Sequence, residues 1–251
     1  MFRPAPIVLA VSLSFGMFGS TLAAPIPSNI TKALADPARP AADLARDAAR
    51  HPGDLLTFAG VKPGAKVADF IIGGGYFTRI LSAAVGPQGH VTAYQPAEFI
   101  QFQASYGENL KTVSDAYKNI TPLSTSLQVM DLPDKLDLVM TVQNYHDLHL
   151  GPFPKDTAAK VNAEVFKSLK PGGVFLIVDH AATLGSGISA ADTLHRIDIA
   201  AVKSEVEAAG FKLAGESSML AASADPHTAN VFDPVIRGKT DQFVLKFVKP
   251  R

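Results

Sequence analysis

The sequence predicts a doubly wound α/β fold around a seven-stranded, mostly parallel sheet. Short apolar runs recur along the chain and are separated by amphipathic helical patterns, which is the order of elements in such folds. Most of the runs are continuous and not alternating, as is typical of strands buried on both faces. At 251 residues the chain is long enough for one such domain with a substantial core. Ligands of these sheets bind outside the carboxyl ends of the strands, so we expect function in the loops that follow them.

The individual elements are predicted from periodicity and turn residues. Helical patterns lie at Ala41–Arg50 and Leu55–Ala59, before the turn Lys62-Pro63-Gly64. Strands are predicted at Lys66–Ile72, His90–Gln95, Leu127–Met130, Leu136–Val142, Val174–Asp179, Lys212–Met219 and Gln242–Val248. Between them, apolar stripes predict helices at Phe77–Ala84, Val161–Leu169 and Ile199–Ala209, which end at Gly86, Pro171-Gly172-Gly173 and Gly210.

The first 24 residues have the pattern of a secretory signal peptide. Met-Phe-Arg precedes an apolar run from Ile7 to Phe18, and small residues follow up to Ala24. We expect cleavage near Ala23 or Ala24, a periplasmic or secreted mature protein, and no stable membrane insertion after cleavage. The predicted organisation is a signal peptide (1–24), a helical lead (25–60) and an α/β domain (61–251).

Composition narrows the classes of partner and chemistry. Basic and acidic residues are balanced at 23 each, and no basic run is visible, so the sequence argues against a nucleic-acid partner and favours a small-molecule substrate. Cysteine is absent, which excludes disulfides, thiolate metal sites and a thiol nucleophile.

The most informative stretch is Val67–Thr78, in which an apolar strand leads through Gly73-Gly74-Gly75 into a helix. Glycine admits positive φ and lets a ligand approach the backbone. A tight turn without a ligand is the simpler alternative, but three consecutive glycines exceed what a turn requires. The spacing is not the G-x-G-x-x-G of dinucleotide-binding folds, because Thr78 stands where the last glycine would be.

This stretch, with Asp69 inside the strand, resembles motif I of class I S-adenosylmethionine-dependent methyltransferases. The segments around it are similar to the same superfamily in their order: Lys62-Pro63-Gly64, Asp131-Leu132-Pro133, Leu136–Val142 and Leu169-Lys170-Pro171-Gly172-Gly173-Val174. Four shorter segments resemble a bacterial family of predicted exported methyltransferases: Gly73–Arg79, Asn144–Asp147, His195–Asp198 and Arg237–Phe243.

The resemblance implies S-adenosylmethionine as cofactor. It assigns Gly73–Gly75 to the methionine end, Gln95 to the ribose and Asp131 to the adenine. The implied set of cofactor-contacting residues is Asp69, Gly73, Gly74, Gly75, Gln95, Asp131 and Asn144. Two positions depart from the family pattern. Ile71 replaces the first glycine, and Gln95 replaces a carboxylate that would accept hydrogen bonds from both ribose hydroxyls.

The catalytic candidates follow the fourth and fifth predicted strands, and they are Tyr145, His146, Asp147 and His180. His146 is expected to act as general base, because its ordinary pKa lies near neutrality, with Asp147 or Asp179 orienting the ring. Tyr76 and Tyr145 are candidates for stacking on a flat ligand, with half-buried packing as the alternative.

Histidine and arginine positions leave further alternatives open. His149, His195 and His227 are also predicted near the ligand-binding edge. His146, His149, His180 and an aspartate suit zinc or iron, yet His-x-x-His is not a recognised ligand spacing, so the expected site contains no metal. Arg79 is expected in a structural ion pair, whereas Arg196 and Arg237 fit either a pocket wall or a link between C-terminal strands.

Three hypotheses on function follow. The first is a methyltransferase acting on a small molecule. The second is an exported, cofactor-independent or metal-assisted lyase or hydrolase, which would account for Ile71, Gln95 and export together. The third is a ligand-binding protein without catalysis. A fold alone does not rank them, because one fold hosts many chemistries.

Overall fold

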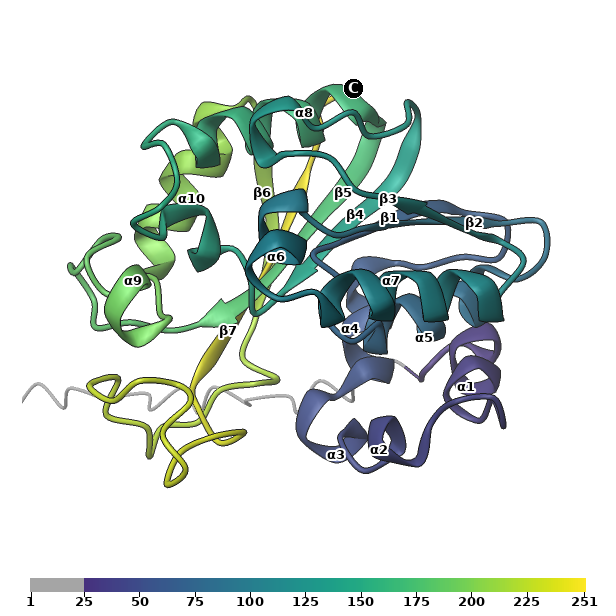
Figure 1. Ribbon diagram of the computed structural model, residues 1–251, viewed down its shortest axis with the longest axis horizontal. Coiled ribbons are helices and arrows are strands. Elements are labelled where there is room, and N and C mark those ends of the chain that lie inside the picture. Colours follow the sequence, from purple (N-terminus) through teal and green to yellow (C-terminus); the bar gives the residue numbers. More distant parts are fainter. Residues whose placement is uncertain (1–24) are drawn as a thin grey trace, which may run out of the picture.

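The computed structural model describes residues 25–251 (Figure 1). The predicted signal peptide therefore lies outside the described residues. The centre is a seven-stranded sheet in the order β3-β2-β1-β4-β5-β7-β6, in which β7 runs antiparallel to both neighbours and the other pairs are parallel. The strands are β1 (Lys66–Phe70), β2 (His90–Tyr94), β3 (Ile120–Leu123), β4 (Leu136–Val142), β5 (Leu169–His180), β6 (Lys212–Ser217) and β7 (Gln242–Val248). The predicted fold class is confirmed.

Helices cover both faces of this sheet (Figure 1). The α-helices are α1 (Ser28–Leu34), α2 (Ala41–Leu44), α3 (Asp47–Arg50), α4 (Pro52–Ala59), α5 (Tyr76–Val85), α6 (Ala97–Phe102), α7 (Ser105–Ala116), α8 (Thr157–Ser168), α9 (Ala191–Leu194) and α10 (Ile199–Ala208), and the short 3₁₀ helices are η1 (Leu127–Val129) and η2 (His146–His149). None of the helices in residues 25–251 is both long and apolar enough to span a lipid bilayer.

Side chains alternate between two hydrophobic clusters along the central strands. Leu138 and Leu176 face the cluster shared with α1, α4, α5 and α7, whereas Val139 and Ile177 face the cluster shared with α8 and α10. This alternation follows from the two-residue period of a strand, and it explains why both faces read as apolar in the sequence.

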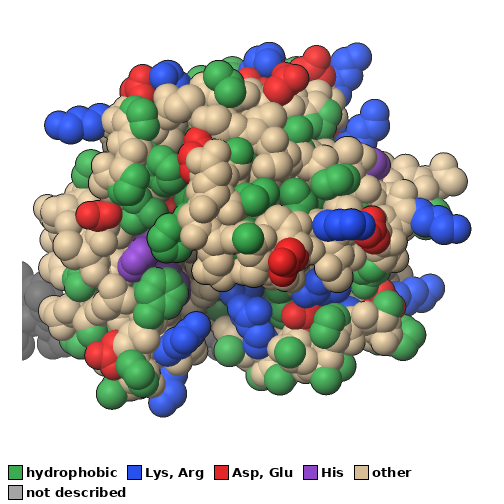
Figure 2. All heavy atoms as spheres, viewed as in Figure 1, with side chains coloured by type: hydrophobic (Ala, Val, Ile, Leu, Met, Phe, Trp, Pro, Cys, Tyr) green, Lys and Arg blue, Asp and Glu red, His purple; other side chains and the backbone are tan. Residues whose placement is uncertain are grey.

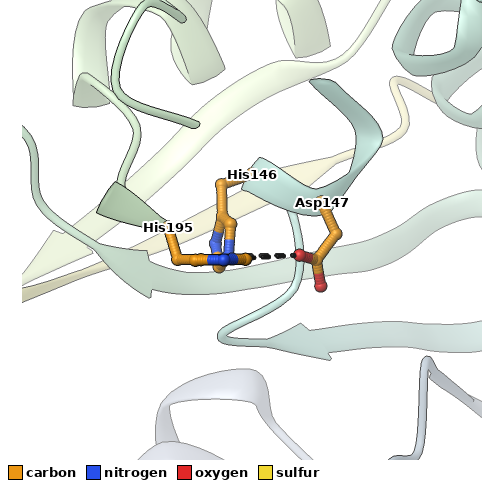
Figure 3. Close-up of side chains that lie close together, drawn as sticks. All are labelled: His146, Asp147 and His195. Atoms are coloured by element: carbon orange, nitrogen blue, oxygen red, sulfur yellow. Dashed lines mark ion pairs between the residues drawn. The ribbon is translucent and has the colours of Figure 1, made fainter. Parts of the chain in front are cut away.

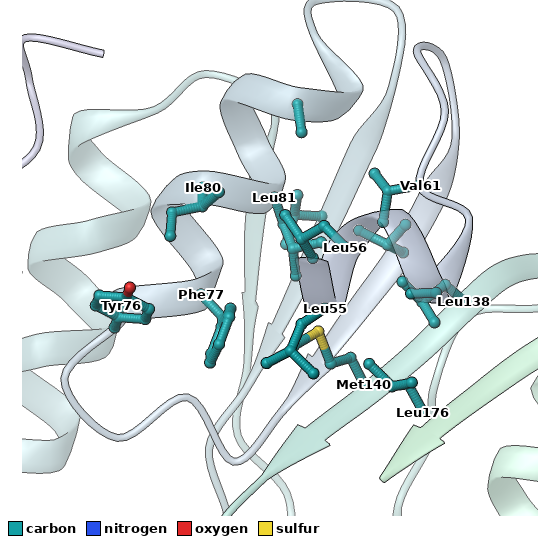
Figure 4. Close-up of a cluster of buried hydrophobic side chains, with 14 of the residues drawn as sticks. Leu55, Leu56, Val61, Tyr76, Phe77, Ile80, Leu81, Leu138, Met140 and Leu176 are labelled. Carbon is teal, nitrogen blue, oxygen red and sulfur yellow. The ribbon is translucent and has the colours of Figure 1, made fainter. Parts of the chain in front are cut away.

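The N-terminal helices belong to the first of these clusters. Leu55 of α4 lies beside the sheet residues Met140 and Leu176 (Figure 4), and Leu56 of α4 and Ile30 of α1 are also fully buried in this cluster. Residues 25–60 therefore share the core of the α/β sheet. The predicted helix Ala41–Arg50 divides into α2 and α3.

The expected strand at Leu127–Met130 is wrong. Leu127–Val129 forms η1, whose first turn is capped by the Ser126 Oγ, which accepts a hydrogen bond from the backbone N of Gln128 at 3.1 Å. The third strand is instead Ile120–Leu123, which pairs only with β2 at the edge of the sheet. Pro122 is tolerated in it because an edge strand needs hydrogen bonds on one side only.

Candidate functional site

A cavity of about 1100 Å³ opens at the carboxyl ends of the parallel strands. Its walls come from the loops after β1 and β4, from the end of β5, from α3 and α6, and from residues 231–237. In Figure 1 the helices α2 and α3 and the yellow-green segment before β7 both lie below the sheet. Figure 2 shows a histidine flanked by hydrophobic side chains at the left of the molecule. The cavity therefore lies where the sequence predicts function.

The three consecutive glycines of the loop after β1 differ in whether the fold requires glycine at their position. Gly73 and Gly75 have φ of +55° and +77°, a region that suits glycine. A Cβ at Gly75 would also lie 3.2 Å from Val113 and 3.1 Å from the Arg79 guanidinium. Gly74 lines the cavity, and its backbone is not in the left-handed region. A Cβ added at Gly74 would meet no atom within 4 Å. Nothing in the fold requires glycine at position 74, which indicates open space kept for a ligand.

Three non-glycine residues of the cavity wall have left-handed backbones. They are Ile71, Gln143 and His195, with φ of 66°, 65° and 53°. A β-branched residue in this region is a true outlier, and Ile71 is held there by its N–H, which donates to the Tyr94 carbonyl at 2.9 Å. Backbone strain of this kind is concentrated at functional sites, so its clustering here is consistent with a ligand site.

Asp69 lies at the base of the cavity, near the glycine loop. Its carboxylate accepts a hydrogen bond from Thr78 Oγ1 at 2.6 Å and is almost fully buried. Burial raises the pKa of Asp69 to about 6, although the Thr78 hydrogen bond and the Arg50 charge oppose that rise. Arg50 donates to Gln143 Oε1 at 2.8 Å and lies over the Tyr76 ring, which links α3 to the loop after β4.

His146 lies between two carboxylates. Its backbone N donates to Asp179 Oδ2 at 2.7 Å, and its Nδ1 is 2.8 Å from Asp179 Oδ1. On the other side of the ring, Nε2 forms an ion pair with Asp147 Oδ1 at 3.2 Å but no hydrogen bond. His195 Nδ1 is 3.8 Å from the same Asp147 oxygen (Figure 3). The structure thus brings together two predicted catalytic residues, His146 and Asp147, with Asp179 and His195.

Electrostatics sets the protonation of these groups. Burial lowers the pKa of His146, but the Asp179 and Asp147 carboxylates outweigh burial and raise it to about 10. Burial raises the pKa of Asp147, but His146 and His195 outweigh it and hold that pKa well below its ordinary value. At neutral pH, therefore, His146 is an imidazolium and Asp147 a carboxylate.

His180, at the end of β5, is the opposite case. Its Nδ1 is 2.8 Å from the Thr240 hydroxyl, and burial lowers its pKa to about 4 despite the neighbouring Asp179 charge. His180 also lines the cavity. The site therefore holds a charged and a neutral histidine, with ring centres 6.2 Å apart.

Two residues implied as cofactor contacts lie away from the cavity. Gln95 is fully buried beneath the glycine loop, where its Oε1 accepts a hydrogen bond from the Gly73 N–H at 3.0 Å. Asp131 lines a separate hollow with His90 and Thr121. Of the remaining implied contacts, Gly75 does not line the cavity, whereas Asp69, Gly73, Gly74 and Asn144 do.

Other candidates from the sequence serve the fold. The Tyr145 hydroxyl lies between Glu205 and Asn162, away from the cavity. His149 contacts Glu205 and His227 contacts Asp241.

The three arginines divide between structure and site. Arg79 pairs with Asp43 at 2.7 Å, which confirms the expected structural ion pair. The guanidinium of Arg196 is fully buried, pairs with Asp225 and donates to two carbonyls, so this residue ties the C-terminal segment to the domain. Arg237 lines the cavity.

Several cavity residues were not anticipated from the sequence. They are Arg46 and Arg50, at the start and the end of α3, and the aromatic residues Phe99, Phe102, Tyr106, Phe153 and Phe232. The two arginines are four residues apart, a spacing that places both on one face of a helix, so they could have been proposed as a pair. The aromatic residues come from α6, α7 and two loops, which no periodic pattern connects.

Comparison with solved structures places this architecture. No family model matches the chain. A SAM-dependent methyltransferase from Aquifex aeolicus is similar at 22% identity and a TM-score of 0.57, over 88% of this chain and 96% of that protein. A TehB-like SAM-dependent methyltransferase from Corynebacterium glutamicum is similar at 15% identity and a TM-score of 0.52, over 80% and 86%. The [4+2]-cyclase SpnF is similar at 15% identity and a TM-score of 0.56, over 81% and 82%. Residues 25–251 thus adopt the Rossmann-like fold of class I methyltransferases.

Proposed function

We propose that this protein is an S-adenosylmethionine-dependent methyltransferase that acts on a small molecule in the cavity at the carboxyl edge of the sheet. The observation that carries the proposal is Gly74, which lines the cavity and is glycine although neither its φ nor its surroundings require it. Support comes from the fold, which this chain shares with methyltransferases from two organisms. The predicted export to the periplasm or outside the cell is part of the proposal.

The residues around the cavity fit this cofactor. Arg46 and Arg50 supply cations for a carboxylate, and Asp69 supplies an anion for an ammonium group, as the amino-acid end requires. Phe99, Tyr106 and Phe153 offer aromatic surface for an adenine. The volume of about 1100 Å³ lies at the upper end of small-molecule sites, so a cofactor and a substrate fit side by side. We place Gln95 as a support of the glycine loop and give Asp131 no cofactor contact.

The cofactor, when bound, supplies a methyl group on a sulfonium. What the chain must add is positioning and the removal of a proton from the acceptor. His146, expected as general base, already carries its proton at neutral pH in the free protein, so we assign it the orientation of an electron-rich acceptor atom. His180 is neutral and lines the cavity, so we assign proton acceptance to its Nε2, in the tautomer in which Nδ1–H donates to the Thr240 hydroxyl.

Calorimetric titration of the purified protein with S-adenosylmethionine and S-adenosylhomocysteine tests the proposal. Wild type is expected to bind both, and Gly74→Asp to abolish binding, because the new side chain fills the open space and places a carboxylate near Asp69. Gly74→Ala is the matched control, since its single methyl group meets no protein atom and adds no charge. It is expected to weaken binding less than Gly74→Asp.

The contrary outcome is equally informative. If wild type binds neither compound, or if Gly74→Asp binds as well as wild type, the cavity does not hold this cofactor in the proposed way. The second candidate would then be a cofactor-independent lyase or hydrolase that uses His180 and His146. The inward-turned Gln95 is the observation that favours it, because its amide accepts from the Gly73 N–H beneath the glycine loop and does not line the cavity.

A further inference from the structure

We propose that His146 Nε2, Asp147 Oδ1 and His195 Nδ1 form a binding site for a divalent first-row transition-metal ion on the wall of the cavity. All three groups offer their ligand atoms within 4.8 Å of one another. The Asp147 oxygen is 3.2 Å from His146 Nε2 and 3.8 Å from His195 Nδ1 (Figure 3). The site goes beyond the proposed methyl transfer and does not depend on it.

The first step of the argument is an unpartnered buried nitrogen. His146 is 2% exposed, and its Nε2 makes no hydrogen bond within the described chain. Buried polar atoms are almost always satisfied by the protein, by water or by a ligand. The protein contact of this nitrogen is the ion pair with Asp147 Oδ1 at 3.2 Å, which leaves it without a hydrogen bond. Both residues line the cavity, so an external group is the expected partner.

The second step is the group behind the ring. His146 Nδ1 is 2.8 Å from the fully buried Asp179, whose other oxygen accepts from the His146 backbone. Metal-binding histidines commonly use one nitrogen for the metal and donate the other N–H to a carboxylate, which fixes the ring and increases its basicity. Asp147 is supported similarly, because the Asn144 Nδ2 donates to its Oδ2 at 3.1 Å and leaves Oδ1 toward the two imidazoles.

The third step is charge. Asp147 and Asp179 place two buried carboxylates beside His146, and across residues 25–251 neither forms an ion pair with a lysine or arginine. Buried charges need a counter-charge, and a divalent cation at Nε2 would meet that need while replacing a proton between the same groups.

The spacing suits a small transition metal after a modest closure. Bonds of about 2.0–2.1 Å in a tetrahedral site separate the ligand atoms by roughly 3.3–3.4 Å. His195 is the partner that can move, because its side chain is 26% exposed and it follows the short helix α9 in a left-handed conformation. A shift of this ring toward Asp147 would complete the set.

The ligand types decide the class of ion. Two imidazoles and one carboxylate suit Zn²⁺, Fe²⁺ or Co²⁺, whereas Mg²⁺ and Ca²⁺ prefer oxygen alone. Three protein ligands leave a position open toward the cavity, as in catalytic and not structural metal sites. An acceptor oxygen or nitrogen in the cavity could occupy that position.

Isothermal titration of the metal-free, tag-free protein with Zn²⁺ tests the site, with Co²⁺ absorption as an independent spectroscopic measure of four-coordinate binding. Wild type is expected to bind one ion per chain. His195→Gly and Asp147→Asn are expected to weaken Zn²⁺ binding by more than about tenfold. Glycine accommodates the φ of 53° at position 195, so that variant removes the ligand without adding strain.

His227→Ala is the matched control, because it removes a histidine paired with a carboxylate, 2.9 Å from Asp241, outside the cavity. It is expected to bind Zn²⁺ as wild type does. The proposal is overturned if wild type binds no ion, or if His195→Gly and Asp147→Asn bind as tightly as wild type. Gly74→Asp separates the two proposals, because it should lose S-adenosylmethionine and keep Zn²⁺.

Discussion

At the scale of single residues, burial of the ionised Asp69 carboxylate lowers the stability of the folded protein. Its pKa rises from the ordinary 3.8 to about 6 because it is buried, so the folded state binds a proton more tightly than the unfolded chain. The buried Asp69 carboxylate therefore destabilises the folded state only slightly near pH 3.8. This loss of unfolding free energy grows as the pH rises toward 6, and it is fully present above pH 6. A shift of this size corresponds to about 3 kcal/mol at neutral pH.

Asp69→Asn should remove this cost while keeping an acceptor for the Thr78 hydroxyl. We expect Asp69→Asn to be more stable than wild type, and this difference in unfolding free energy to depend on pH. It should be larger at about pH 7.5 than at about pH 4.5, by about 1–3 kcal/mol. Urea denaturation at both pH values measures it, with the exposed Asp134→Asn as control. An equal effect of Asp69→Asn at both pH values would show that Asp69 titrates normally.

The sequence located the residues of the site more reliably than their orientation. His146, Asp147 and His180 were expected at the ends of neighbouring strands, and all three line the cavity. Strand order fixes such positions, because parallel strands end at the same edge. The direction of Gln95 could not be foreseen, since its amide turns inward to accept from Gly73, a contact that exists only when two loops pack together. The protonation of His146 depends likewise on Asp179, which lies 33 residues away.

At the scale of elements, the turn from β1 into α5 combines a structural glycine with one that the fold does not need. Gly75→Ala places a Cβ in a left-handed backbone and against Val113, so we expect a loss of about 1–3 kcal/mol in unfolding free energy. Gly74→Ala should change it by no more than about 0.5 kcal/mol. Chemical denaturation of the pair decides this, and equal losses would contradict the assignment of separate roles.

Elements followed from the sequence where a pattern was strong. Leu136–Val142 and Gln242–Val248 are strands with the predicted bounds, because each is a mostly apolar run and pairs with a strand on both sides. The strand Ile120–Leu123 was missed because it contains Pro122 and two exposed positions, so it lacks the apolar pattern of a strand. The helix α7 was missed because only Leu110 and Val113 of its twelve residues are buried, which leaves a weak apolar stripe.

At the scale of the whole molecule, two segments far apart in the sequence line the same cavity. Arg46 and Arg50 come from the N-terminal lead, while Phe232 and Arg237 come from the segment that precedes β7. Both segments are anchored to the domain by side-chain contacts. Arg50 of the lead donates to Gln143, and Arg196 donates to Asp225 of the later segment. The lead therefore acts as part of the site, although the sequence suggested a boundary at residue 60.

The same packing predicts how the molecule unfolds. Ile30 and Leu55 of the lead are fully buried in the cluster that contains the sheet residues Met140 and Leu176. Leu55→Ala should leave a cavity in that shared core and lower the unfolding free energy of the whole domain by about 2–5 kcal/mol. Since the core is continuous, the transition should remain single, with an unchanged dependence on urea concentration.

Leu44→Ala is the control within the same lead, because Leu44 is 48% exposed and its loss should cost no more than about 0.5 kcal/mol. Urea melts followed by circular dichroism distinguish the outcomes, because residues 25–60 hold four of the helices whereas the remaining helices and the sheet lie in residues 61–251. An early transition that removes only part of the helical signal would mean that residues 25–60 unfold separately. The helical lead would then be able to separate from the rest of the cavity, and the free energy of ligand binding would include the free energy of docking the lead onto the domain.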